Sequence, residues 1–93
     1  MKGKKTMHVQ NITGNRGNKI ANQFRIYTDN GSIFQSYDSI IVKIESGKTY
    51  LDQKYWNYSN TTGKYRNIFL GETIKDTKKK IKSGEYLLTD LNK

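Results

Sequence analysis

The sequence predicts a small α+β domain, in which an antiparallel β-meander of about four to five strands precedes two short helices and a short closing strand. Two pairs of turn residues, Asn30-Gly31 and Ser46-Gly47, lie between runs of alternating apolar residues, a pattern typical of β-hairpins. After Leu51 the apolar spacing changes from every second residue to every third or fourth, which indicates helices. A length of 93 residues suits one modest core.

The sequence predicts a flexible basic arm at residues 1–6 and a single α+β domain at residues 7–93. The lysines of the arm are Lys2, Lys4 and Lys5. A short first strand is expected at residues 8–12, before the loop TGNRGNK, which is rich in glycine and asparagine.

The first hairpin is expected to use Asn30-Gly31 as a two-residue loop in which both residues have positive φ. This loop places Tyr27 opposite Phe34 on the neighbouring strand. Because side chains alternate between the faces of a strand, one face is expected to form the core, with Ile20, Phe24, Ile26, Ile33 and Tyr37. The opposite face carries Arg25, Tyr27, Phe34 and Ser36.

The second hairpin is expected to turn at Ser46-Gly47, which pairs Glu45 with Lys48 across the strands. Its core face is expected to contain Ile40, Val42, Ile44, Thr49 and Leu51. Lys43 and Tyr50 lie together on the opposite face.

Two helices are expected at residues 61–70 and 74–82, followed by a short closing strand in EYLLTDL. The first has apolar residues at i, i+3 and i+4 and is expected to end at Gly71. The second has Thr73 as its N-cap candidate and Gly84 at the position favoured for glycine after a helix.

The net charge is +9, and the positive charge is concentrated in two stretches. Residues 1–19 contain five Lys or Arg and no acid, and residues 54–83 contain eight bases and two acids. This asymmetry favours a polyanionic partner. An alternative explanation is that lysine has AT-rich codons, so a low-GC genome supplies many lysines, although codon bias does not explain why acids avoid these two stretches.

Several classes of function are excluded or disfavoured by composition. The chain has no cysteine, so disulfides and thiolate metal sites are excluded, and no apolar run approaches the roughly 20 residues of a membrane span. His8 is the only histidine, the eight carboxylates are scattered, and no phosphate-binding loop motif is present. We therefore expect a soluble intracellular protein that is not an enzyme and uses no metal or cofactor.

The segments NQFRIYT and GSIFQSYDSIIVKI, together with KYWNYSNTTGKYRNIFLGE and the ending SGEYLLTDLN, resemble a family of small proteins of unknown function encoded by bacteriophages and prophages of low-GC bacteria. The resemblance covers about residues 20–92. It implies an origin in a phage or mobile element and a location in the cytoplasm of the host bacterium, and it supplies no site residues.

Three surfaces are candidates for a polyanion. On the second helix, Lys75, Lys79 and Lys82 share one face at i, i+4 and i+7. At the start of the first helix, phosphate contacts are expected from Thr61, Thr62, Lys64 and Arg66. The third surface is the outer sheet face, a possible stacking platform for single-stranded bases, with Arg25, Tyr27, Phe34, Lys43 and Tyr50. The alternatives are a solvated helix, plain helix capping, and a sheet face that a helix covers.

The leading hypothesis is a small phage-type accessory protein that binds DNA or RNA through phosphate contacts, with the arm lysines adding affinity. The alternative is an anti-defence, anti-CRISPR-like inhibitor that binds and blocks a host protein, with Trp56 and Tyr58 as interface anchors. A homo-oligomer with an aromatic self-interface is a further alternative.

Overall fold

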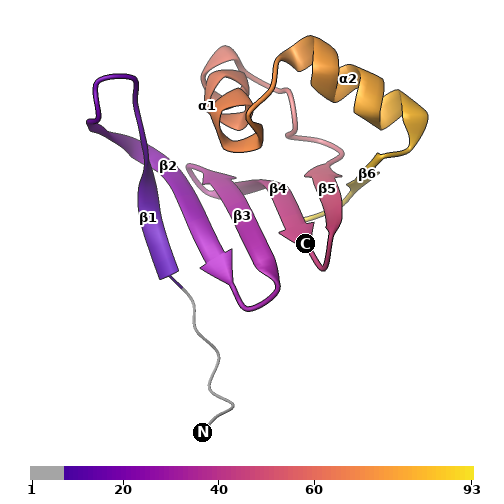
Figure 1. Cartoon of the computed structure of the whole chain (residues 1–93), viewed down its shortest axis with the longest axis horizontal. Coiled ribbons are helices and arrows are strands. Elements are labelled where there is room, and N and C mark those ends of the chain that lie inside the picture. Colours follow the sequence, from indigo (N-terminus) through magenta and orange to yellow (C-terminus); the bar gives the residue numbers. More distant parts are fainter. Residues whose placement is uncertain (1–7) are drawn as a thin grey trace, which may run out of the picture.

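The computed structural model describes residues 8–93, which form one six-stranded sheet and two helices (Figure 1). The strands lie in chain order and are β1 (His8–Thr13), β2 (Lys19–Thr28), β3 (Gly31–Ser36), β4 (Ser39–Glu45), β5 (Lys48–Asp52) and β6 (Tyr86–Thr89). The helices are α1 (Asn60–Leu70) and α2 (Ile74–Ser83). Neighbouring strands are antiparallel from β1 to β5, whereas β6 is parallel to β5. The predicted α+β class and the predicted order of elements are confirmed.

Both helices begin and end at residues with strong capping preferences. The Ser59 hydroxyl accepts a hydrogen bond from a backbone N–H in the first turn of α1, and Gly71 ends this helix with a φ of 69°. Thr73 and Asp76 form a capping box at the start of α2, and Gly84 ends it with a φ of 88°. The predicted roles of Gly71, Thr73 and Gly84 are confirmed.

The parallel pairing of β5 with β6 places both helices on one face of the sheet. Parallel neighbours need a long crossover, and α1 and α2 form it. In this crossover α1 lies over β3 and α2 lies over β6 (Figure 1). Asp52, at the end of β5, connects the start of the crossover to the C-terminal residues, because its carboxylate accepts hydrogen bonds from the N–H groups of Tyr55 and Leu91 at 2.8 Å each.

The second hairpin forms as predicted and the first is displaced. Ser46 and Gly47 both have positive φ, and Glu45 pairs with Lys48. In the first hairpin the pairing of Thr28 with Gly31 puts the turn one residue earlier, and neither Asn30 nor Gly31 has positive φ. A Cβ on Gly31 would lie 1.8 Å from the carbonyl oxygen of Ile44, so glycine is required here by the close approach of β4.

The predicted core face is correct for the second hairpin and wrong for the first. Phe34, Val42 and Leu51 are fully buried and lie on the same face, because Phe34 pairs with Val42 and Val42 pairs with Leu51. Phe69 of α1 stacks on Phe34 with 5.7 Å between ring centroids, and this contact buries the face that was expected to be exposed. A β-bulge in β4 also skips Ile41, which is fully buried in place of the predicted Ile40.

A buried carboxylate holds the two helices and β6 together. Glu72, between α1 and α2, accepts hydrogen bonds from the Thr77 hydroxyl at 2.5 Å, the Lys80 ammonium at 2.7 Å and the Tyr86 hydroxyl at 2.8 Å. Burial alone would raise the pKa of Glu72, but these hydrogen bonds favour the charged form and lower the pKa below its ordinary value. The ionised carboxylate is therefore part of the native packing.

Replacing Glu72 with glutamine is expected to destabilise the protein by about 1–3 kcal/mol at neutral pH, because charge-assisted hydrogen bonds are lost. Since the native pKa is lowered, the contribution of the carboxylate is complete above about pH 4.3, the unfolded value, and is lost as the pH falls through the native pKa. The stability gap between the wild type and Glu72→Gln should therefore shrink below about pH 4.3.

Urea unfolding at neutral pH, near pH 5 and near pH 3 would measure this gap. The matched control is Glu85→Gln, which removes an exposed carboxylate. A gap that stays constant with pH would contradict the assigned role of Glu72.

Candidate functional site

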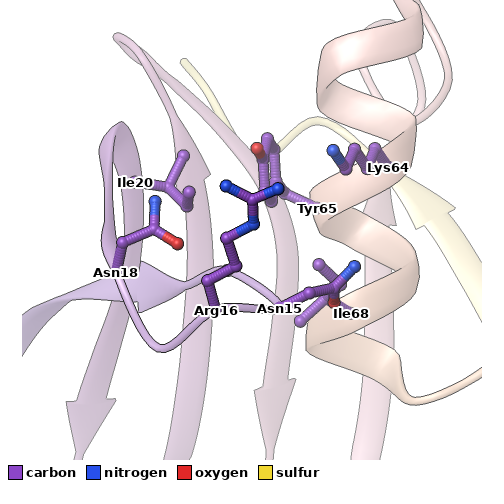
Figure 2. Close-up of a pocket in the computed structure, with 8 residues that line it drawn as sticks. Asn15, Arg16, Asn18, Ile20, Lys64, Tyr65 and Ile68 are labelled. Atoms are coloured by element: carbon purple, nitrogen blue, oxygen red, sulfur yellow. The ribbon is translucent and has the colours of Figure 1, made fainter.

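A hollow of about 310 Å³ lies between α1 and the loop that joins β1 to β2 (Figure 2). Arg16 extends from the loop into the space between these elements, and Lys64 and Tyr65 approach it from the helix (Figure 2). The other lining residues are uncharged, and they are Gly14, Asn15, Asn18, Ile20 and Ile68. The hollow is therefore lined by two cations, an aromatic ring and two amides.

The loop holds Arg16 through a compact backbone. The Gly14 N–H donates to the Asn18 carbonyl at 2.8 Å, and the Gly17 N–H donates to the Gly14 carbonyl at 3.0 Å. Gly17 has a φ of 78°, which glycine adopts without strain. A side chain at Gly14 would place its Cβ 2.9 Å from Asn18 Oδ1, so the small residue keeps the loop tight.

The two cations of the hollow have no acidic partner in the part of the chain that the structure describes. Arg16 and Lys64 are both exposed, and neither forms a salt bridge within residues 8–93. The Lys64 ammonium lies 5.4 Å from the centre of the Tyr65 ring, a cation–π contact that leaves its N–H donors available. An anionic group is therefore the ligand that this charge distribution favours.

A second hollow, of about 500 Å³, lies on the other side of Lys64 at the start of α1. Lys64 lines both hollows, and the second one extends to Ile74, the first residue of α2. Four lysines of α2 are exposed, and three of them, Lys75, Lys79 and Lys82, share one face of the helix. We refer to Arg16, Lys64, Lys75, Lys79 and Lys82 together as the basic strip.

Arg66 does not belong to this strip, which corrects its prediction as a phosphate ligand. Its side chain is 1% exposed, and its guanidinium donates to the carbonyl oxygen of Trp56 at 2.7 Å and to the amide oxygens of Asn57 and Asn67 at 3.0 and 2.9 Å. Burial lowers the pKa of Arg66, and the charge of Glu72 opposes this effect. Nη1 of Arg66 therefore holds the loop before α1 against the helix, whereas its buried Nε has no hydrogen-bond partner among the described residues.

The two threonines predicted at the start of α1 differ in their placement. Thr62 is fully buried, with its hydroxyl 3.0 Å from that of Ser36, so the prediction of a phosphate contact by Thr62 is corrected. Thr61 is exposed and stays a candidate.

The predicted stacking face is divided between the two sides of the sheet. Phe34 is buried under α1, and the Arg25 guanidinium lies 4.6 Å from the centre of the Phe69 ring. Tyr50 pairs with Lys43 on the opposite face, and Tyr27 is exposed on the helix side. The alternative in which a helix covers this face is therefore correct for Arg25 and Phe34, because α1 needs an apolar surface for Phe69.

Of the two predicted protein-interface anchors, only Tyr58 is exposed. Trp56 is half-buried against the core, with the Arg66 guanidinium 5.4 Å from its ring centre. Tyr58 is 50% exposed and makes an edge contact with Tyr55, with 5.2 Å between centroids. The arm lysines Lys2, Lys4 and Lys5 lie outside the described residues.

Sequence reasoning missed Arg16 as a site residue. The segment GNRGNK was tested only as a phosphate-binding loop, and it has the wrong spacing for one. The sequence feature that indicates Arg16 is a single arginine between two glycines at the tip of a hairpin. A side chain at such a tip projects beyond the strands and can contact a ligand.

Replacing Arg66 with alanine is expected to cost about 2–4 kcal/mol of stability, because a buried guanidinium that donates to three part-buried acceptors is lost. The control variant Lys64→Ala should change stability by less than about 0.5 kcal/mol, since Lys64 is exposed. Urea unfolding of both variants measures the difference, and equal losses would contradict a structural role specific to Arg66.

Two classes of site are not found in residues 8–93. No group of three His, Cys, Asp or Glu side chains in this range is arranged to hold a metal ion. No helix of the described chain is long and apolar enough to span a membrane.

Comparisons with known proteins give one match. A model for a family of unknown function, DUF8033, matches residues 7–86. No curated protein and no solved structure matches the chain. Because the match covers the sheet as far as β6 and both helices, the chain belongs to the DUF8033 family.

Proposed function

We propose that this protein binds nucleic acid without catalysis, through phosphate contacts along the basic strip, and prefers single strands. The observation that carries the proposal is the hollow beside α1, where Arg16 and Lys64 have no counter-charge among the described residues and Tyr65 forms an aromatic wall. Guanidinium and ammonium groups bind phosphate oxygens, and a tyrosine ring accepts a stacked base.

The shape of the hollow supports the preference for single strands. Its volume of about 310 Å³ lies at the lower end of the range for small-molecule pockets. An unstacked base can enter such a space while its phosphate meets Arg16 or Lys64. A duplex keeps its bases stacked and offers only phosphates to the strip.

The lysines of α2 extend the surface but add little sequence preference. Lys75, Lys79 and Lys82 are compact charges without the bidentate geometry that reads base edges. The arm lysines Lys2, Lys4 and Lys5 are proposed to add affinity. The resemblance to phage proteins supports an origin in a phage or mobile element of a low-GC bacterium, with action in the host cytoplasm.

One observation favours a second candidate function, the inhibition of a host defence protein by direct binding. Tyr58 is half-exposed, and its edge contact with Tyr55 restrains its ring. Restrained, exposed tyrosines are frequent anchors of protein interfaces. In this alternative the basic strip docks on an acidic protein surface.

The test is fluorescence anisotropy with a labelled single strand and a labelled duplex, over a salt series, on nuclease-treated protein. The variant Arg16→Gln/Lys64→Gln should lower the affinity for the single strand by roughly tenfold or more. It should also reduce the slope of log K against log salt by about 1.4, the value for two lost contacts to a single strand. The matched control is Lys48→Gln/Lys93→Gln, which removes two exposed charges that line neither hollow.

Equal losses in the two double variants would contradict a site at the hollow, since only general charge would then matter. Absence of binding by the wild type at low salt would contradict nucleic-acid binding altogether. The second candidate would then be tested by capture from host lysate with Tyr58→Ala as the control.

A further inference from the structure

The sheet face opposite the helices carries a continuous row of side chains that crosses all six strands. The cross-strand pairs connect one residue of each strand to the next, and the row consists of Val9, Ile26, Ile33, Lys43, Tyr50 and Leu87. We refer to these six residues as the apolar row. Five of the six are apolar or aromatic, and no described helix lies on their face.

The apolar row is not part of the hydrophobic core. None of its members belongs to the core cluster of the described residues or to the partly buried residues packed against it. Val9 is 56% exposed and Leu87 is 42% exposed, and the members between them are shielded in part by their neighbours in the sheet. A contiguous, partly exposed apolar surface of this kind is a candidate interaction site.

This face carries only a small part of the charge of a strongly basic protein. By alternation along the strands its accessible charged residues are Lys43, Glu45 and Lys48. Lys43 and Glu45 form a salt bridge of 2.9 Å. Lys19 lines a hollow with Val9 at the edge of the face, whereas Asp52 is 1% exposed and its carboxylate accepts hydrogen bonds from backbone N–H groups. Most of the net charge of +9 therefore comes from other surfaces, including the basic strip on the helix side.

We propose that the apolar row is a homodimer interface, in which this face packs against the same face of a second copy. Strands lie about 4.8 Å apart, so the row extends about 24 Å, and strands of this length extend about 17–23 Å. The projected area of such a face is roughly 400–550 Å². The side chains that stand above the backbone increase the accessible area toward the roughly 800 Å² per partner of a standard interface. In such a dimer the basic strips of the two copies point away from each other. The electrostatic repulsion between two chains of charge +9 is then smaller than in a dimer that joins the basic strips.

The charges of the face select one symmetry for the dimer. One two-fold axis runs parallel to the strands, between β3 and β4. It sets the apolar row of one copy against the apolar row of the second copy in reverse strand order. Ile33 then lies opposite Lys43 of the second copy, and Val9 lies opposite its Leu87. An axis along the row would instead set Lys43 against Lys43, which like charge disfavours. In the dimer the methylene groups of Lys43 pack on Ile33 of the second copy, while the Lys43 ammonium retains its salt bridge with Glu45.

The test is the molar mass of the full chain by light scattering after size exclusion, with nuclease-treated protein over a concentration series up to about 100 μM, so that a weak dimer is also detected. The wild type should have the mass of a dimer. Ile33→Lys and Leu87→Lys should raise the dimer dissociation constant by roughly tenfold or more, because each buries an unpaired charge at the interface.

Leu88→Lys is the matched control, since Leu88 is 44% exposed and lies on the opposite side of β6 from Leu87. It should change the dissociation constant by less than about twofold. A monomeric wild type, or equal weakening by Leu87→Lys and Leu88→Lys, would overturn the proposal. The wild-type mass decides the question even if a lysine variant fails to fold. The proposal is independent of nucleic-acid binding.

Discussion

The parallel pairing of β5 with β6 is the constraint on which the rest of this structure depends. A chain that leaves β5 can only become its parallel neighbour by crossing one face of the sheet. Both helices are therefore committed to that face, and the opposite face receives no cover from them. Asp52 supports this arrangement, because its carboxylate accepts hydrogen bonds from a backbone N–H at the start of the crossover and from another in the residues after β6.

The helix layer is attached to the sheet by buried polar groups as well as by apolar side chains. Arg66 connects α1 to the preceding loop, Thr62 meets Ser36 on β3, and Glu72 joins α2 to Tyr86 on β6. Each of these groups is buried and hydrogen-bonded, so each specifies the position of a helix as well as stabilising it. Aromatic stacking of Phe69 on Phe34 provides the apolar part of the same contact.

This one-sided architecture separates two kinds of surface. The helix side carries exposed cations that end at a hollow with an aromatic wall, and the bare sheet side carries a row that is apolar except for Lys43, which is paired with Glu45. The two proposals are compatible because they use opposite sides of the molecule. A dimer joined through the apolar row would present two basic strips outward, and a long polyanion could then contact both, which raises affinity through effective concentration.

The sequence by itself determined the fold class, the order of the elements, both helix ends and the second hairpin, because these depend on local chemistry. Capping residues and a Ser-Gly turn act within a few residues of chain. The sheet face that became core was decided only by tertiary structure. Ile26 and Ile33 suggested a core face by composition, yet the parallel return of β6 placed α1 over Phe34 instead. The hollow also required tertiary structure, since Arg16 and Lys64 are 48 positions apart and meet only when α1 lies beside the first loop.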